Sequence, residues 1–526
     1  MNADANLRWQ EAEALTAQGQ EIRARAIYLA LTGDRALAPF AHLRLGVFAR
    51  RDGDPDAAQQ HALAAFRSAC ADPELLELVA KSLLRAGLVQ EALACADALL
   101  RLDAPVGALA EVGKLLSDHM LPEAALALLG RALERGLPAT PAVRYLIGLN
   151  RMYLGHTAQA QEALEASLRG NAELAPAHWA LAKLAAPDGR AARIDRLRAA
   201  LARTPGSAPD APLLWYALFH ELDRADDAAA WESLQHGMRL RRAQVRHSEA
   251  EDEALFDAAH RALRLPPAAD STGTAAESTP IFVVGMPRTG TTLIEQALCA
   301  RVDAASAGEL RDLTLQLRAL RRQPGPPHFD ARLLEAVTPE QAQSLGARYL
   351  ERSRWRARSR ACYIDKWPEN YLAAGLLLAA LGQARVVWVQ RDPMDACFSN
   401  LKEWFAASYF YSYDPKETAR RCARFERLGA ALRERADARV AFLRYEDFVR
   451  APESCLDRVI DRLGLPRRTS ASLAPEATIV TASANQVREG ISTRHVGAWR
   501  RYAEPLSPLR DELERLGLER AGDASA

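Results

Sequence analysis

The sequence predicts an α plus α/β fold, with an all-α repeat region followed by an α/β domain that has a parallel sheet. Three observations support this. Residues 1–265 are rich in Ala, Leu and Arg, follow a helical period and contain almost no strand-like runs. Residues 266–280 have the composition of a linker. Strand-like runs at 281–284, 385–390 and 440–444 then alternate with helical segments. We therefore predict a helical domain over 1–265, a linker over 266–280 and an α/β domain over 281–526.

A short motif recurs through the helical region. An acidic or amide residue followed by Ala begins the second helix of each predicted pair, at Asp56-Ala57, Glu91-Ala92, Glu123-Ala124 and Gln159-Ala160, with weaker copies at Ala191-Ala192 and Asp227-Ala228. The copies lie about 34 residues apart, and the unit around Leu45-Gly46 resembles the tetratricopeptide pattern. That resemblance implies stacked helix pairs that form a solenoid with a concave groove. An irregular bundle of alanine-rich helices is the alternative.

Composition argues against several classes of protein. Lys and Arg number 68 against 67 Asp and Glu, a formal net charge of +1, so no overall field favours nucleic acid or a membrane surface. The seven cysteines lack CxxC spacing, which argues against disulfides and a zinc site and favours a reducing, cytoplasmic compartment. The longest apolar run, 372–389, contains Gly382, Gln383 and Arg385, so we expect a helix, a turn and a strand rather than a membrane span.

The first strand-like run of the α/β domain leads into a glycine-bracketed loop. Its spacing, Gly285-x4-Gly290-Thr291-Thr292, is that of a phosphate-binding P-loop, but Thr291 stands where such a loop needs lysine. Backbone N–H groups at the helix start would hold an anion, and Arg288 is the only cation of the loop. We predict contacts to an anionic nucleotide other than ATP or GTP from Arg288, Thr289, Gly290, Thr291 and Thr292. A tight turn without a ligand is the alternative.

A second candidate phosphate site follows the strand predicted at 385–390. Arg391 ends that strand, Asp392-Pro393 begins a helix, and Ser399 lies about two turns along it. Because ligands of parallel sheets bind at the carboxyl ends of the strands, Arg391 and Ser399 are placed to meet one phosphate. A structural ion pair for Arg391 and a surface position for Ser399 are the alternatives.

Together, the loop at 281–292 and the pair Arg391 and Ser399 resemble the sulfotransferase family. The loop resembles the 5′-phosphosulfate loop of that family, and the pair resembles its 3′-phosphate motif. The implied co-substrate is 3′-phosphoadenosine 5′-phosphosulfate, and no metal is required. Within the family the sequence is most similar to tyrosylprotein sulfotransferases and to bacterial proteins that join tetratricopeptide repeats to a sulfotransferase domain. The catalytic similarity covers roughly 280–505, which implies a P-loop-like sulfotransferase domain.

The resemblance implies catalytic roles at two further segments. Residues 307–311 resemble the Gly-Glu-x-Arg segment of tyrosylprotein sulfotransferases, which implies that Glu309 is the catalytic base and that Arg311 binds the acceptor. Residues 365–368 resemble the segment that supplies a charge-stabilising lysine, here Lys366.

The resemblance also extends to the nucleotide contacts. The segment 482–487 implies Ser483 as a second stabilising group, and the implied nucleotide contacts are Tyr445, Gln486, Val487, Arg488, Trp499 and Arg500. The sequence departs from the family pattern at Ala498, where lysine is expected, and at Glu403, where arginine is expected and Lys402 is adjacent. Candidates for the cation missing at Ala498 are Arg494, Arg500 and Arg501.

The resemblance implies in-line transfer of a sulfuryl group to an acceptor hydroxyl, with Glu309 accepting the proton. A protein or peptide tyrosine, delivered by the repeat groove, is the expected acceptor, and a glycan or a small-molecule hydroxyl is the alternative. The aromatic segment 404–413 is either an acceptor pocket or part of the core. A catalytically inert repeat scaffold is disfavoured, because the predicted catalytic and phosphate-binding side chains are present together. A kinase is disfavoured by the missing lysine. The oligomeric state stays open.

Overall fold

The computed structural model describes residues 3–68, 72–184, 189–223, 225–269, 278–468 and 490–518. The chain forms two compact units. Unit 1 comprises Met1–Asn150 with Arg311–His328, and unit 2 comprises Arg151–Leu310 with Phe329–Ala526. These units do not follow the division at 265 and 281, because the helices after residue 151 pack with the α/β domain. The division into a repeat region, a linker and an α/β domain stays a prediction about sequence modules.

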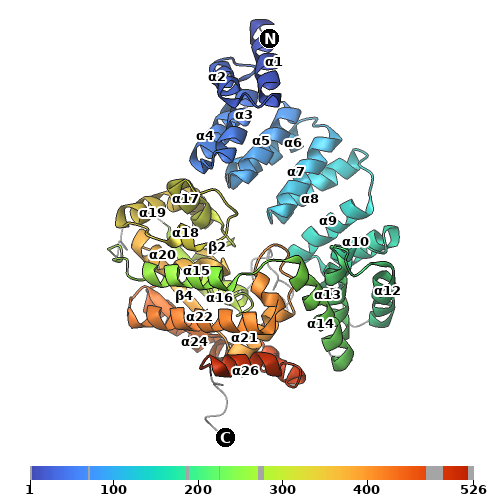
Figure 1. Cartoon of the computed structure of the whole chain (residues 1–526), viewed down its shortest axis with the longest axis vertical. Coiled ribbons are helices and arrows are strands. Elements are labelled where there is room, and N and C mark those ends of the chain that lie inside the picture. The colour runs from blue at the N-terminus through green and yellow to red at the C-terminus, as the bar shows by residue number, and fades with distance from the viewer. Residues whose placement is uncertain are drawn as a thin grey trace. The chain divides into compact units, whose positions relative to one another are not determined.

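Unit 1 is built from antiparallel helix pairs, coloured blue to cyan in Figure 1. Its helices are α1 (Ala3–Ala17), α2 (Glu21–Leu31), α3 (Ala38–Arg51), α4 (Pro55–Ser68), α5 (Pro73–Arg85), α6 (Val89–Arg101), α7 (Val106–Asp118), α8 (Pro122–Glu134) and most of α9 (Pro141–Tyr153). Local signals set their bounds: Asp72 caps α5 by accepting hydrogen bonds from the N–H groups of Glu74 and Leu75, and Pro73 occupies the first turn. Helices α4, α6 and α8 contain the predicted motif copies at their starts.

Small residues let the paired helices approach closely. A Cβ atom on Gly113 of α7 would lie 3.0 Å from Cγ of Leu129 in α8. The buried apolar side chains from α4 to α8 form one cluster, which includes Val79, Leu83, Leu109 and Val112, and those of α1 to α3 form another. Each pair therefore buries its apolar face against its neighbours, as in a repeat solenoid.

A segment from the second half of the sequence, 311–328, packs against the turns of this solenoid. It contains α17 (Asp312–Arg321). A Cβ atom on Gly53, in the α3–α4 turn, would lie 2.8 Å from Cγ of Pro324, and one on Gly87, in the α5–α6 turn, would lie 2.7 Å from Cδ1 of Leu315. The segment thus follows successive turns in the direction opposite to the order of the repeats.

The helical part of unit 2 continues the pattern of pairs. It comprises α10 (Thr157–Gly170), α11 (Ala175–Leu184), α12 (Arg190–Arg203), α13 (Ala211–Leu222), α14 (Asp227–Gln244) and α15 (Glu249–Ala262). The motif copies at 159, 191 and 227 lie at the starts of α10, α12 and α14. The chain is therefore tetratricopeptide-like through α14, and its repeats are divided between the two units.

A five-stranded parallel sheet forms the centre of the α/β domain. Its strands are β1 (Thr279–Val284), β2 (Ala304–Gly308), β3 (Cys362–Asp365), β4 (Arg385–Gln390) and β5 (Val440–Arg444). Their spatial order is β2-β3-β1-β4-β5, and every pairing is parallel. The parallel sheet and the strands predicted at 281–284, 385–390 and 440–444 are confirmed. Strands β2 and β3 were not predicted.

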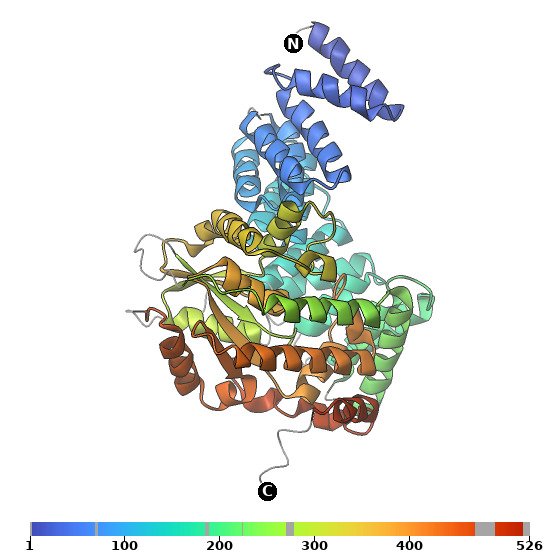
Figure 2. The same cartoon turned by 60° about the vertical axis from the view of Figure 1, so that its left-hand side comes forward.

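Helices cover both faces of the sheet (Figure 2). Besides α17, the described α-helices that follow β1 are α16 (Thr291–Arg301), α18 (Ala331–Leu334), α19 (Pro339–Ser353), α20 (Ala374–Ala380), α21 (Pro393–Leu401), α22 (Pro415–Glu434), α23 (Tyr445–Arg450), α24 (Pro452–Leu463) and α26 (Ser507–Arg515). The run 372–389 forms α20, a turn and β4, as predicted. None of the helices in the described ranges is both long and apolar enough to cross a membrane.

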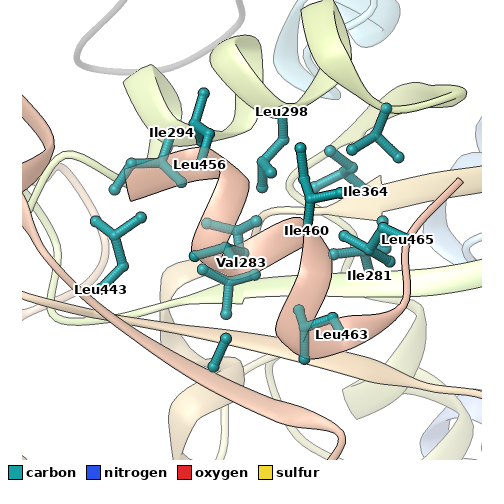
Figure 3. Close-up of a cluster of buried hydrophobic side chains, with 14 of the residues drawn as sticks. Ile281, Val283, Ile294, Leu298, Ile364, Leu443, Leu456, Ile460, Leu463 and Leu465 are labelled. Carbon is teal, nitrogen blue, oxygen red and sulfur yellow. The ribbon is translucent and has the colours of Figure 1, made fainter. Parts of the chain in front are cut away.

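Successive side chains of β1 point to opposite faces of the sheet and contribute to the hydrophobic core on each face. Ile281 and Val283 face α16 and α24, where they join an aliphatic cluster that Figure 3 shows with Ile294, Leu298, Leu456 and Ile460. The neighbouring residue Phe282 belongs to the opposite, aromatic face, where its ring centroid lies 5.5 Å from that of Tyr349 in α19. With both faces buried, the strands read as continuous apolar runs. Polar side chains lie instead at the carboxyl edge of the sheet, directly after the strands end.

Candidate active site

The loop after β1 has the geometry of an anion-binding loop. Gly290 has a φ of 98°, and a Cβ atom there would lie 2.5 Å from Cδ2 of Tyr445, so both the backbone and the space require glycine. Arg288, with a φ of 69°, is also left-handed, a strain that is typical of functional loops. The Thr289 hydroxyl donates to the carbonyl of Met286 at 2.7 Å. The loop is therefore held in shape before any ligand arrives.

Arg391 links this loop to the ends of β4 and β5. Its Nη1 donates to the carbonyl of Arg288 at 2.9 Å and its Nη2 to the carbonyl of His495 at 2.7 Å. Its guanidinium lies 4.6 Å from the ring centroid of Tyr445. Burial raises the pKa of Tyr445, so its ring stays neutral. The two predicted nucleotide residues therefore stack against each other beside the glycine loop.

Helix α21 supports both the loop and the C-terminal segment. The buried Asn400 donates from Nδ2 to the carbonyl of Pro287 at 2.7 Å. Asp395 accepts from the N–H of Gly497 at 2.6 Å and from that of Trp499 at 3.4 Å. Burial raises the pKa of Asp395, partly offset by Arg391 and by these two hydrogen bonds. One helix thus fixes two segments that are distant in sequence from each other.

These elements enclose a cavity at the carboxyl edge of the sheet. Six of the predicted nucleotide residues line it, namely Arg288, Gly290, Thr292, Arg391, Ser399 and Tyr445. Lys402, His495 and Ala498 complete part of its wall. Arg391 and Ser399, which sequence reasoning assigned to one phosphate, therefore do share one cavity with the glycine loop.

A second pair of predicted residues meets at the ends of β2 and β3. Lys366 is fully buried, and its Nζ donates to Oε1 of Glu309 at 2.6 Å. The side chain of Glu309 is 37% exposed, so it remains accessible from solvent. The backbone N–H of Lys366 also donates to the carbonyl of Gly308 at 2.8 Å. The predicted base and the predicted charge-stabilising lysine thus form an ion pair.

The buried Asp365 positions this pair. Its Oδ1 accepts from the N–H groups of Leu310 at 3.3 Å and Trp367 at 3.1 Å. Its Oδ2 accepts from the Tyr349 hydroxyl at 2.9 Å and from Nδ2 of Asn370 at 3.2 Å. The two backbone donors are adjacent to Glu309 and Lys366 in sequence. Because it accepts hydrogen bonds from both segments, the Asp365 carboxylate fixes the segment that follows β2 relative to the segment that follows β3.

The strand order places these groups in a line. Along the carboxyl edge, β2 is followed by Glu309, β3 by Lys366, β1 by the glycine loop, β4 by Arg391 and β5 by Tyr445. Anion-binding and base-stacking groups therefore lie on one side of the glycine loop, and an accessible carboxylate lies on the other. Such an edge suits transfer of an anionic group from a nucleotide on the β4–β5 side to an acceptor on the β2–β3 side.

Some predicted residues do not reach this cavity. Thr289 bonds within its own loop, Thr291 is buried at the start of α16, and Trp499 is buried with its N–H on Asp395. Arg500 is exposed, 5.4 Å from the Trp499 ring centroid. Arg311 belongs to unit 1. Burial lowers the pKa of His119, and the positive charge of Arg311 lowers it further. Ser483, Gln486, Val487 and Arg488 lie outside the described residues.

Lys402 lies where a cation was expected near Ala498. Lys402 and Ala498 line the same cavity, and Arg288 and Arg391 line it too. Arg501, one of the three candidates, forms ion pairs with Asp223 and Asp227 instead. Arg494 lines an adjoining cavity with Lys402. Lys402 thus provides a cation at this wall. In the sequence it directly precedes Glu403, the position where the resemblance implies arginine.

Comparison with known proteins agrees with this geometry. Residues 280–469 match the family model described as "Sulfotransferase family". This part of the chain is a sulfotransferase-family domain. The match spans all five strands of the sheet, from β1 to β5, and both pairs of site residues described above.

The chain shows likenesses to individual proteins, among them the following three. An uncharacterised protein of Aquifex aeolicus (strain VF5) is 29% identical over 252 residues, which are 45% of this chain and 32% of that protein. The chain thus covers about a third of the length of this relative. The sulfotransferase domain from the curacin biosynthetic pathway shares 15% identity with a TM-score of 0.30, covering 46% of this chain and 96% of that one. YrrB, a tetratricopeptide protein with an unusual peptide-binding site, shares 18% identity with a TM-score of 0.28, covering 34% and 91%.

The sulfotransferase domain also contains residues that sequence reasoning did not select. Asn400 follows the predicted Ser399, Asp395 lies in the same helix, and Asp365 precedes Lys366. Each is a buried polar side chain next to a motif residue, which is the signal that could have found it. In the described parts of the chain, no group of three or more His, Cys, Asp or Glu side chains could hold a metal ion.

Proposed function

We propose that this chain transfers a sulfuryl group from 3′-phosphoadenosine 5′-phosphosulfate to an acceptor hydroxyl. The observation that carries the proposal is the order of groups along the sheet edge, from Glu309 and Lys366 through the glycine loop to Arg391 and Tyr445. The 3′-phosphate would be held by Arg391 and Ser399, and the adenosine would lie against Tyr445. The phosphosulfate would lie on the loop N–H groups and Arg288.

The chemistry follows from this placement. An acceptor oxygen attacks the sulfur in line, the bond from sulfur to the 5′-phosphate oxygen breaks, and Glu309 accepts the hydroxyl proton. The products are a sulfate ester and 3′,5′-adenosine bisphosphate. Arg288 and Lys366 would stabilise the charge that develops on the sulfuryl and bridging oxygens, since preorganised cations act strongly in a buried site.

We further propose a protein or peptide tyrosine as the acceptor. The support is the resemblance of 307–311 to the base segment of tyrosylprotein sulfotransferases, together with helical repeats, which commonly bind peptides. The aromatic segment 404–413 contributes little, because Phe405, Tyr411 and Tyr413 are buried in the core. We place the protein in a reducing, cytoplasmic compartment, in accord with its six described cysteines, which form no disulfide with one another.

Transfer of radiolabelled sulfate from the donor to matched acceptors tests the proposal. The panel contains a tyrosine peptide in an acidic context, the same peptide with phenylalanine, a glycan and a simple phenol. Label on the tyrosine peptide alone supports both parts of the proposal. Label on the glycan or the phenol alone refutes the tyrosine acceptor and keeps sulfuryl transfer. Absence of label, with ATP and Mg²⁺ stabilising the protein instead of 3′,5′-adenosine bisphosphate, refutes the whole proposal.

Arg391→Ala is expected to weaken binding of 3′,5′-adenosine bisphosphate by about 10–100-fold, because a hydrogen bond to a charged group contributes about 1.5–3 kcal/mol. Binding of adenosine 5′-monophosphate, which lacks the 3′-phosphate, should change little. Titration calorimetry with both nucleotides checks this. Arg391 also donates to the carbonyls of Arg288 and His495. Equal losses for the two nucleotides would therefore show a structural role in place of 3′-phosphate recognition.

Nucleotide affinity should depend on pH through Lys402. Burial lowers the pKa of Lys402 to about 8; Asp223 opposes this shift, and Arg288 and Arg391 add to it. Only the protonated lysine attracts a phosphate, so affinity for 3′,5′-adenosine bisphosphate should fall as pH rises through about 8, approaching tenfold per pH unit. Calorimetry between pH 7 and 9 measures this.

Lys402→Met is the control, and its affinity should be nearly flat over this range. Unfolding cannot explain a loss in the wild type. The folded pKa lies below that of the unfolded chain, so the unfolded state binds more protons and stability contributed by Lys402 rises with pH. A wild-type profile as flat as that of Lys402→Met would contradict the prediction.

A further inference from the structure

The helices before the linker contact the end of α21 at three consecutive residues. The Tyr216 hydroxyl in α13 donates to the carbonyl of Leu401 at 3.1 Å. His220, one turn later, lies with Nε2 3.2 Å from the carbonyl of Lys402. Burial lowers the pKa of His220 to about 3, so the ring is neutral and Nε2–H is the donor. These bonds satisfy backbone acceptors that a helix end leaves without partners.

The third contact is an ion pair. Nζ of Lys183 in α11 lies 2.7 Å from both carboxylate oxygens of Glu403. The side chains are 15% and 4% exposed, so the pair is shielded from solvent. Lys183 also lies 5.0 Å from the ring centroid of Trp179. Glu403 is the position where the resemblance leads us to expect a cation, and here a cation comes from a helix 220 residues earlier in the sequence.

The same carboxylate faces Arg288 of the glycine loop. Oε2 of Glu403 lies 3.5 Å from Nε of Arg288, whose side chain is 5% exposed. This contact is longer than the two contacts to Lys183, so the carboxylate is bound mainly by the lysine. Two cations therefore share one anion. Together, Lys183, Arg288 and Glu403 carry one net positive charge beside the loop, which favours an anionic ligand.

Removal of Lys183 would change that balance. Glu403 would be left as a buried anion with Arg288 as the one remaining cation of its two ion pairs, and such a carboxylate strongly attracts the remaining partner. Arg288 would then be held by Glu403 and drawn away from the ligand. Removal of the charge of Glu403 as well would release Arg288 again.

We propose that Lys183 is a positioning residue of the sulfotransferase site, which neutralises Glu403 and so keeps Arg288 available to the 5′-phosphosulfate of the donor. This inference rests on the proposed function, because it assumes a donor with a 5′-anion in the cavity. It makes the helices 151–265 part of the catalytic unit, in addition to any acceptor binding by the repeats.

Calorimetry on the full chain tests this with two ligands. One is 3′,5′-adenosine bisphosphate, and the other is adenosine 3′-monophosphate, which lacks the 5′-phosphate that Arg288 would contact. Lys183→Met should weaken the bisphosphate about tenfold, within the about 5–150-fold range of couplings between sites. Its affinity for the monophosphate should stay within about twofold of the wild type, which also shows that the variant folds.

Two further variants separate electrostatics from packing. Lys183→Arg keeps the charge and should bind both ligands nearly as the wild type does. Adding Glu403→Gln to Lys183→Met should recover most of the lost bisphosphate affinity, although it removes a second member of the cluster. A purely structural role predicts the reverse, a further loss for both ligands.

The outcomes are distinguishable. Bisphosphate binding by the wild type, selective loss in Lys183→Met and recovery in the double variant support the inference. Equal loss of the two ligands, no loss, or no recovery overturns it and leaves the proposed function intact. A wild type that binds neither adenine nucleotide overturns the proposed function and the inference together.

Discussion

Glu309→Gln is expected to lower kcat for sulfuryl transfer by about 10²–10⁴-fold, the range that general base catalysis contributes. Glutamine keeps the size of the side chain and an oxygen for the Nζ of Lys366, which lies 2.6 Å from Oε1 in the wild type. It cannot accept the acceptor proton. The loss should therefore appear in the chemical step, measured as single-turnover transfer of radiolabelled sulfate with saturating donor.

Binding measurements complete this test. Affinity for 3′,5′-adenosine bisphosphate should stay within about twofold, because Glu309 follows β2, whereas the nucleotide residues Arg391 and Tyr445 follow β4 and β5. Glu453→Gln, an exposed glutamate at the start of α24, is the matched control and should leave kcat unchanged. Near-normal turnover by Glu309→Gln would assign the base to another residue. Loss of nucleotide binding would instead indicate a disturbed sheet edge.

The strands show what local pattern can and cannot predict. Strands β1, β4 and β5 are apolar runs bounded by Gly, Pro or charged residues, so the pattern was sufficient. Strand β2, Ala304–Gly308, consists of small residues at the sheet edge, and β3, Cys362–Asp365, has only four residues. Neither contains a run long enough to show a period. Pairing with neighbouring strands, which a single sequence does not display, makes them strands.

The site divides in the same way. Residues directly after strand ends, such as Arg288, Arg391 and Tyr445, were identifiable because parallel topology gathers strand ends at one edge. Asp365 supports Glu309 and Lys366, and Asn400 supports the glycine loop. Their hydrogen-bond partners include residues far away in the sequence, such as Leu310 and Pro287. Lys183 lies in a helix that reads as an ordinary repeat. Its link to Glu403 depends on tertiary packing alone, so no motif reveals it.

Lys366→Met is expected to lower kcat by about 10²–10³-fold, the effect of removing one preorganised donor to developing charge. Lys366 is fully buried at the end of β3, between Glu309 and the glycine loop in the strand order. Methionine fills a similar volume without a charge, so the backbone contact from residue 366 to Gly308 can persist. Single-turnover transfer measures the loss, and Lys416→Met, an exposed lysine in α22, is the control.

The double variant Glu309→Gln with Lys366→Met shows which role Lys366 has. If Lys366 only orients Glu309, the double variant should be no slower than Glu309→Gln alone, since there is no base left to orient. If Lys366 stabilises sulfuryl charge in its own right, the double variant should be slower than either single variant. The 2.6 Å contact to Glu309 couples the two side chains, so we expect a combined loss between the larger single loss and the product of both. A loss equal to the full product would mean that the ion pair of the free protein has no part in the transfer step.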